Sequence, residues 1–279
     1  MENAADFPIT PKLIREAEEQ RKKGANGVAA KLTESALTLK DPNELDAHKQ
    51  NLALAALRIH GTAGVSLANS SDQAPDVANG LKLAKKMFDL IFENPNLRKA
   101  VDVLKKNFEG NPDDFKAEFG RLEAKYLITL SSLTGDASLL NIAAEILNEI
   151  AKNSEETTAK TLASYESARI MFKRDKSNEQ YDDLSKKYSD AFNSAYKAKN
   201  WERSATESAW YVVDSVKSFH PTGAITGLIN YGKTVAHDMS NWSIIFRQMF
   251  KAITEDKRHR GWSKTTPSDA NYIDELKLK

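Results

Sequence analysis

The segment from residue 227 to residue 234, GLINYGKT, has the residue types and spacing of a phosphate-binding loop. It matches the pattern G-x-x-x-x-G-K-[ST] at every fixed position, with Gly227, Gly232, Lys233 and Thr234 in place. In such a loop the backbone N–H groups surround the phosphates of a nucleotide, the lysine reaches the terminal phosphates, and the hydroxyl binds Mg²⁺. Taken alone, the motif predicts an NTPase.

The sequence around the motif lacks the other parts of a nucleotide site. A phosphate loop follows a buried strand, but the residues before it, SFHPTGAIT, contain no strand-like apolar run. Positions 228–231 are mostly bulky, whereas the loop must turn tightly. After Thr234 no apolar strand ends in the aspartate that would complete a magnesium site. We therefore expect a chance match.

A helix explains the same residues better. An apolar stripe at helical spacing begins near Pro221-Thr222 and predicts the face that lies against neighbouring helices. Gly227 and Gly232 would then mark the closest approach to those neighbours, and Lys233 would be incidental. The stripe comprises Ile225, Leu228, Ile229, Gly232, Val235, Ala236 and Met239.

No other combination of residues indicates catalysis. The chain has no cysteine, which excludes thiolate nucleophiles and cysteine-bound zinc, and it has no Gly-x-Ser-x-Gly or Glu-x-x-His pair. No two histidines have the three- or four-residue spacing that would let them share a metal on one helix. We predict no catalytic residue, no cofactor and no metal site. The histidines are His48, His60, His220, His237 and His259.

A basic cluster near the C-terminus suggests a second kind of function. Lys257, Arg258 and Arg260 precede Trp262, and cations beside an aromatic ring can bind a phosphate backbone and stack on bases. Cations at the end of a helix also offset its dipole and bind its last carbonyl groups, which is the role we favour. Nucleic-acid binding through residues 257–264 is the alternative.

The composition is that of a globular protein with balanced charge. The 279 residues include 40 Lys plus Arg and 39 Asp plus Glu, so no overall field selects nucleic acid, an anionic membrane or an acidic partner. No apolar run approaches the roughly 18 residues of a membrane span, and the N-terminus lacks an apolar signal segment. We therefore expect a cytoplasmic protein.

Helical periodicity runs through almost the whole chain. Only 12 glycines and 8 prolines interrupt it, which predicts long helices with short connections and antiparallel neighbours. Cap residues stand before several stripes, for example Asp41, Asn94, Ser177 and Asn200. We predict helices over residues 10–23, 27–40, 42–69, 75–93, 95–109, 112–134, 136–152, 155–174, 178–198, 201–219, 223–239 and 241–257.

One stretch resembles the tetratricopeptide repeat. In YSDAFNSAYKAKNWERSATESAWYVV, Tyr188 stands at the family's first aromatic position, Asn200-Trp201-Glu202 matches the turn between the two helices, and Ser204 matches the small residue after the turn. Phe192 and Ala195 depart from the pattern. The resemblance spans roughly residues 42–239, and the repeat-like segments within this range are irregularly spaced.

This resemblance implies a helical groove that binds a peptide or a partner helix. Asn193 and Lys197, one helical turn apart on the second half of the predicted helix 178–198, would then be groove residues. The same four-residue spacing of polar residues is also typical of a solvent-facing helix.

We predict an all-α fold, an array of antiparallel helix hairpins forming a tetratricopeptide-like α-solenoid, with an irregular α-helical bundle as the alternative. A single helical domain would cover residues 1–257, with its core over about 42–257, and residues 258–279 would form a basic tail with one short helix. The predicted function is a non-enzymatic scaffold that binds a protein or peptide. An enzyme or regulatory subunit without a recognisable site is a further alternative.

Overall fold

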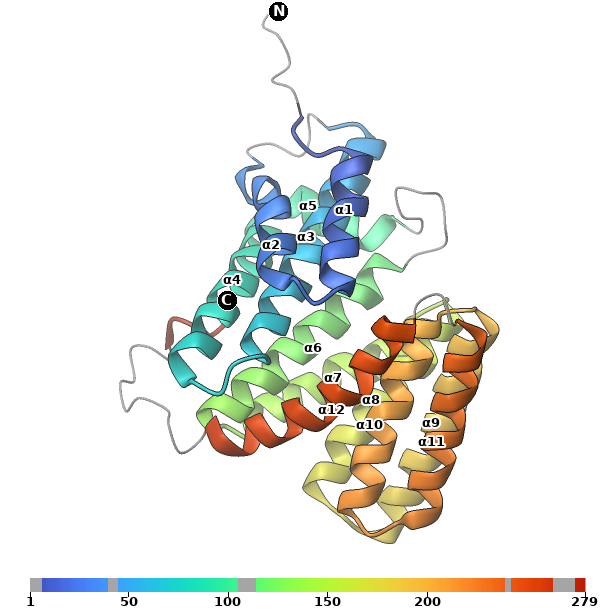
Figure 1. The fold of residues 1–279 in the computed structure, drawn as a ribbon. Coiled ribbons are helices and arrows are strands. Elements are labelled where there is room, and N and C mark those ends of the chain that lie inside the picture. The colour runs from blue at the N-terminus through green and yellow to red at the C-terminus, as the bar shows by residue number, and fades with distance from the viewer. Residues whose placement is uncertain (1–6, 40–44, 105–113, 239–241, 263–273, 279) are drawn as a thin grey trace, which may run out of the picture. The chain divides into compact units, whose positions relative to one another are not determined.

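The computed structural model describes residues 7–39, 45–104, 114–238, 242–262 and 274–278, except for the side chains of residues 260 and 261. All the regular structure in these residues is helical (Figure 1), so the chain is all-α. The first half contains α1 Pro11–Lys22, α2 Asn26–Thr33, the 3₁₀ helix η1 Glu34–Thr38, α3 Ala47–Ala68, α4 Ala74–Glu93, α5 Pro95–Val103 and α6 Phe115–Thr134. The second half contains α7 Ser138–Asn153, α8 Thr157–Arg174, α9 Asn178–Lys197, α10 Trp201–Lys217, α11 Pro221–His237 and α12 Trp242–Trp262.

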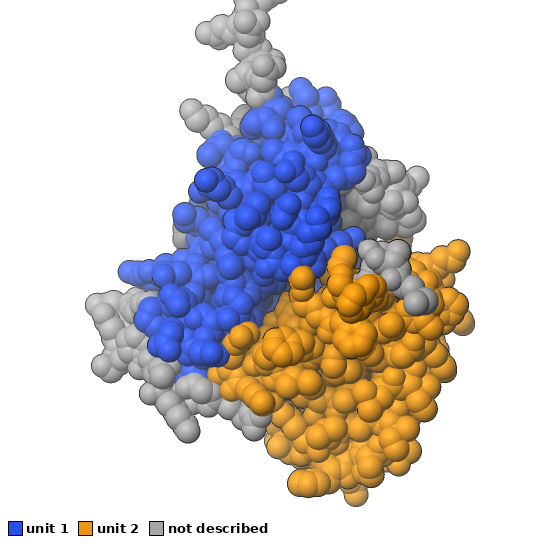
Figure 2. All heavy atoms as spheres, viewed as in Figure 1, with its two compact units in different colours: residues 1–139, 261–279 blue, residues 140–260 orange. Residues whose placement is uncertain are grey.

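The chain divides into two compact units (Figure 2). The first unit comprises residues 1–139 and 261–279, and the second comprises residues 140–260. The predicted boundary between a domain and a tail at residue 257 falls inside α12, which continues to Trp262. That the two units work as a single domain stays a prediction.

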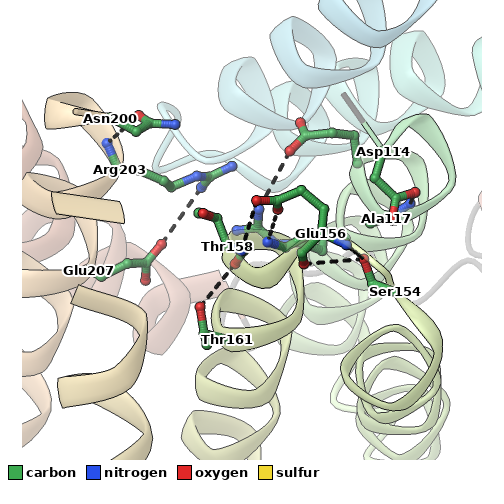
Figure 3. Close-up of polar contacts among 12 residues, drawn as sticks. Asp114, Ala117, Ser154, Glu156, Thr158, Thr161, Asn200, Arg203 and Glu207 are labelled. Atoms are coloured by element: carbon green, nitrogen blue, oxygen red, sulfur yellow. Dashed lines mark hydrogen bonds and ion pairs between the residues drawn. The ribbon is translucent and has the colours of Figure 1, made fainter. Parts of the chain in front are cut away.

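Polar caps begin several helices at the predicted positions. Asn94, Ser177 and Asn200 each accept a hydrogen bond from a backbone N–H two or three residues further on, which satisfies a donor that the first turn leaves without an intrahelical partner. Figure 3 shows the bond from the Arg203 N–H to Asn200, 3.2 Å long, and the Glu156 carboxylate that caps α8. Local hydrogen bonding therefore fixes where these helices start.

Helix α3 begins later than the sequence predicted. A capping pattern at Asp41 predicted a helix over 42–69, and Asp41 itself lies outside the described residues. The helix begins at Ala47, because the Asp46 carboxylate accepts a hydrogen bond of 2.8 Å from the Lys49 N–H and so caps the first turn.

The core of the first unit surrounds α3. Fourteen of the 22 residues of this helix are buried, many more than the single buried face of a surface helix, and α1, α2, α4, α5 and α6 all pack against it. Its contact with α4 is the tightest. A Cβ atom added to Gly80 would lie 2.4 Å from the Ala68 nitrogen, and one added to Gly64 would lie 2.7 Å from the Ala84 nitrogen. The two helix backbones therefore meet directly, without side chains between them.

The core of the second unit is rich in tyrosine. The rings of Tyr188 and Tyr211 stack with their centroids 4.0 Å apart, and the Tyr165 ring lies 5.7 Å from that of Tyr188. Burial raises the pKa of the Tyr188 hydroxyl to about 12, so the group stays neutral, and it lies 2.9 Å from the Ser208 hydroxyl. The buried Tyr188 ring is thus anchored by a polar partner as well as by its apolar surface.

A membrane-spanning segment is absent from the described residues, because none of the helices there combines the necessary length with enough apolar character.

His60 of α3 is held neutral inside the first unit. The residue is fully buried, its Nδ1 lies 3.1 Å from the Ala30 carbonyl oxygen, and the Thr33 hydroxyl is 3.3 Å from the same nitrogen. Because a carbonyl oxygen only accepts, Nδ1 carries the proton. Burial lowers the pKa of His60 below its usual value of 6.5, against the opposing effect of the Ala30 hydrogen bond.

The buried neutral His60 predicts a stability loss in mild acid. Below about pH 6.5 the His60 imidazole binds a proton in the unfolded chain but stays neutral in the folded chain. The free energy of unfolding therefore falls as the pH decreases through that value. Denaturant titrations at about pH 8 and about pH 5 should show a smaller loss for His60→Gln than for the wild type. His48→Gln, which removes an exposed histidine, should behave as the wild type does. Equal losses in all three proteins would contradict the account of His60.

Candidate partner-binding surface

All eight residues of GLINYGKT lie inside helix α11. Helix α11 begins at Pro221, as the sequence predicted, and its backbone N–H groups are engaged in intrahelical hydrogen bonds instead of curling around an anion. Lys233 lies on an exposed turn of this helix, whereas Thr234 is buried and its hydroxyl donates to the Asn230 carbonyl at 3.0 Å. The helical interpretation of the motif is confirmed.

The orientation of α11 differs from the prediction. Its buried residues are small or hydroxylated, and the three largest residues at the start of the predicted apolar stripe are exposed: Ile225 by 57%, Leu228 by 51% and Ile229 by 53%. Val235 is half-buried, Ala236 is exposed, and Met239 lies outside the described residues. The buried face comprises Gly223, Ala224, Gly227, Tyr231 and Thr234.

Small residues explain this orientation. A Cβ atom on Gly227 would lie 2.7 Å from a methyl carbon of Val212 and 3.3 Å from the Ser208 carbonyl oxygen, so α11 and α10 approach closely at this glycine, as predicted. Gly232 was predicted to mark a second close approach, and that prediction is wrong, because no atom lies within 4 Å of its Cβ position. The helix therefore packs its small residues closely against α10 and leaves its larger apolar side chains exposed.

Helix α12 carries a second exposed apolar row. Its members are spaced four, four and three residues apart, which places them along one side of the helix, and each is 43–69% exposed. We did not predict this row from the sequence, although its spacing is visible there. Helix 241–257 has a second apolar side, which includes Ile245 and Ala252, and only that side is buried. The row comprises Trp242, Phe246, Phe250 and Ile253.

One residue of each row, Leu228 and Phe246, lies at the seam between α11 and α12. The Tyr231 hydroxyl donates a 2.6 Å hydrogen bond to the Ile245 carbonyl, and the Tyr231 ring meets the edge of Phe246 with centroids 6.4 Å apart. Leu228 stands one helical turn before Tyr231 on α11, and therefore on the side of α11 that adjoins α12. We call these seven exposed residues the α11–α12 surface: Ile225, Leu228, Ile229, Trp242, Phe246, Phe250 and Ile253.

One charged pair joins α12 to α10, and a second joins α8 to α10. Lys217 donates a hydrogen bond to the Asp256 carboxylate, and Arg169 of α8 binds Asp214 of α10 with a 2.6 Å bond while its guanidinium lies 4.3 Å from the centre of the Trp210 ring. Such partly buried pairs fix the relative position of helices, and removing one partner leaves an uncompensated charge.

His259 extends this charged cluster. Burial lowers its pKa to about 3, and the positive charges of Lys173 and Lys217 act in the same direction. The imidazole is therefore neutral at physiological pH and adds no further cation to the cluster.

The basic cluster near residue 260 does not present an aromatic ring. Trp262 is fully buried, and its indole N–H donates a 3.0 Å hydrogen bond to the Ser71 carbonyl. Lys257 is exposed, Arg258 is half-buried, and the side chain of Arg260 lies outside the described residues. The cluster continues α12 instead of following its end, and its tryptophan is part of the first unit's core.

Asn193 and Lys197 are both exposed on α9. The Asn193 amide lies 3.4 Å from the Ser189 hydroxyl one turn earlier, a local contact that solvent-facing helices often make. The described residues contain no group of three or more acidic or histidine side chains arranged to hold a metal ion.

Comparison of the chain with protein-family models, with curated proteins and with solved structures found no match. No relative therefore assigns a role to any of its residues.

The two glycines of GLINYGKT should respond oppositely to substitution. Gly232→Ala adds a methyl group in open space and removes a flexible residue from a helix, so it should stabilise the protein by about 0.5–1 kcal/mol. Gly227→Ala drives a methyl group against Val212 and the α10 backbone and should destabilise it by about 1–2 kcal/mol. Denaturant unfolding measures both values, and a destabilising Gly232→Ala would contradict the exposed position of Gly232.

Proposed function

We propose that this chain is a non-enzymatic interaction module that binds a partner protein through the α11–α12 surface. In this proposal the second unit is a tetratricopeptide-like array of antiparallel helix hairpins, and α11 with α12 is its last hairpin. The carrying observation is the exposure of seven large apolar side chains on that hairpin. Exposed apolar patches of this kind are typical of interaction sites in soluble proteins.

The order of contacts between α9 and its neighbours supports the array. Asn230 donates a 3.1 Å hydrogen bond to the Tyr188 hydroxyl, and the ring of His237 lies 5.3 Å from that of Tyr196. Later residues of α9 thus contact later residues of α11, as in two helices that run in the same direction. Against α10 the order is reversed: Tyr188 contacts Ser208, whereas the earlier Ser185 accepts a hydrogen bond from the later Tyr211.

The contacts between α8 and α10 also show two helices that run in the same direction. Along α8 and α10, Tyr165 bonds to the Glu207 carbonyl and the later Arg169 bonds to the later Asp214. In the α9–α11 and α8–α10 pairs, the contacting residues are about 40–45 positions apart in the sequence. This separation is longer than the roughly 34-residue tetratricopeptide period. The likeness to that family therefore lies in how hairpins stack, and its implied peptide groove would involve α9 residues such as Asn193 and Lys197.

The first unit fits the alternative prediction of an irregular bundle. Its helix α3 is buried on most sides, which is the arrangement of a central helix wrapped by others and differs from stacked hairpins. The tetratricopeptide-like proposal accordingly applies to the second unit alone. We do not propose nucleic-acid binding, because the tryptophan on which that alternative depended is buried.

An array of stacked hairpins needs a polar outer face on its last hairpin, because no further repeat covers that face. The last hairpin of the second unit has apolar rows there instead. A partner protein that covers these rows would remove them from water, with a gain of roughly 25 cal/mol for each Å² of apolar surface buried.

Cross-linking capture tests the proposed function. The immobilised full chain, with a photo-cross-linker at Ser243 beside the α12 row, should label one protein reproducibly. Phe250→Ser with Ile253→Ser should reduce the yield at least about tenfold, because the anchors of an interface carry most of its energy. Val28→Ser, an equally exposed apolar residue in the first unit, is the matched control and should leave the yield unchanged.

Two further variants separate the competing surfaces. Asn193→Asp with Lys197→Glu disturbs only the α9 face, and Lys257→Gln with Arg258→Gln disturbs only the basic cluster. Loss of labelling in either of these, with full labelling in the Phe250→Ser and Ile253→Ser double variant, would move the binding site away from the α11–α12 surface and overturn the proposal.

A further inference from the structure

Residues 274–278, which we call the C-terminal turn, pack on the first unit beside α4 and α6 (Figure 1). The Lys277 N–H donates a 3.2 Å hydrogen bond to the Asp274 carbonyl, which closes a single turn. Leu276 is fully buried, whereas its neighbours on both sides in the sequence are exposed. One apolar side chain therefore enters the unit from a segment that otherwise lies largely at its surface.

Tyr126 of α6 contacts the backbone of this turn. Its ring is fully buried and meets the edge of the Phe88 ring of α4, and its hydroxyl donates a 2.5 Å hydrogen bond to the Leu276 carbonyl. Burial raises the pKa of this hydroxyl above its usual value of 10, so the group stays a donor. Within the described part of the chain that carbonyl is its one hydrogen-bond partner. Without the turn, the hydroxyl needs another acceptor.

An ion pair forms at the residue before the leucine. The Lys82 ammonium group of α4 lies 2.6 Å from the Glu275 carboxylate, and the two side chains are 42% and 61% exposed. A pair this open to water contributes little free energy, but it favours an acidic residue at its position. Lys277 pairs with Asp274 inside the turn, so the site itself contacts two features of its occupant: a leucine in a turn and an acidic residue immediately before it.

Few contacts hold the turn in this site. Among the described residues they comprise one fully buried side chain, one hydrogen bond between neutral groups and one exposed ion pair. Segments with so few buried contacts open at a lower free energy than the core of the same protein. Trp262 is buried separately and bonded to the Ser71 carbonyl, so the end of α12 has an attachment of its own.

We propose that the surface of α4 and α6 around Lys82 and Tyr126 is a peptide-binding site, that the C-terminal turn occupies it as a tethered ligand, and that a partner protein binds there by displacing the turn. The partner presents a leucine in a turn, preceded by Glu or Asp, because the present occupant supplies those groups. A tethered ligand competes at an effective concentration on the order of millimolar, so the turn excludes weak competitors. This site lies in the first unit and is independent of the α11–α12 surface.

A single thiol in the full chain tests this inference. The natural chain has no cysteine, and Leu276→Cys places a small apolar residue with a thiol at the buried position. Alone, this thiol should react at least about tenfold more slowly than the same thiol in a free peptide of residues 273–279. Wild-type peptide of residues 273–279, added at millimolar concentration, should raise the rate to within about twofold of that of the free thiol. The same peptide with Leu276→Ser should have no effect.

The full chain without a cysteine gives a second measurement. A fluorescently labelled wild-type peptide should bind the Leu276→Ser chain at least about tenfold more tightly than the wild-type chain, in which the turn competes. Binding to the wild-type chain should still be saturable, so the test does not depend on the folding of a variant. Circular dichroism should show the same helix content in both chains.

Further variants assign the displacement to this site. A peptide with Glu275→Lys should bind the Leu276→Ser chain at least about threefold more weakly than the wild-type peptide does, and Lys82→Glu in that chain should reverse the preference. Lys31→Glu, which changes an exposed lysine of α2, is the matched control and should leave the preference unchanged.

Each contrary outcome overturns a stated part. A Leu276→Cys thiol as reactive in the folded chain as in the free peptide would show that the turn does not occupy the site. A protected thiol that millimolar peptide fails to expose, with no binding of the labelled peptide, would make the turn a permanent part of the first unit and overturn the peptide site. A concentration-dependent dimer of the wild-type chain, lost in Leu276→Ser, would replace the partner protein by the turn of a second copy.

Discussion

Close contact between helix backbones at glycine, alanine and serine determines how α3 packs on α4 and α11 packs on α10. In the first unit, Gly64 and Gly80 bring α3 and α4 together with no room for a side chain. In the second unit, Gly227 does the same for α11 against α10. Protein interiors tolerate few voids, so a helix whose small residues fit a neighbour's backbone is held in one rotation. That rotation determines which side chains remain outside, and on α11 it leaves Ile225, Leu228 and Ile229 in solvent.

The positions of the helices could largely be read from the sequence, because periodicity and caps are local. Asn94, Ser177 and Asn200 act within three residues of themselves, and each starts a helix where predicted. Asp41 and Asp46 show the limit of this reasoning, because aspartate at either position could cap a helix. The residue that caps α3 is Asp46, through the hydrogen bond from the Lys49 N–H. The division into two units was not predicted, because it depends on contacts between distant residues such as the bond from Trp262 to Ser71.

The candidate surface was harder to predict than the fold. Hydrophobic periodicity gives the direction of an apolar stripe and assumes that this stripe is buried. On α11 the assumption fails, since the buried face consists of glycine, alanine, threonine and one tyrosine, which hydropathy ranks below isoleucine and leucine. The same failure produces the surface for which we propose a partner, because apolar residues displaced from the core need another cover. Asn193 and Lys197 were accessible to sequence reasoning as a polar pair, and their role stays a prediction.

The reactivity of single introduced thiols measures the rotation of α11 against its neighbours. The natural chain has no cysteine, so Ile229→Cys and Thr234→Cys each introduce a single thiol on the same helix. In the native protein the Ile229→Cys thiol should react at nearly the rate of a free thiol, and the buried Thr234→Cys thiol should react on the order of a hundredfold more slowly. A protected thiol at position 229 together with a reactive thiol at position 234 would show that α11 has a different rotation.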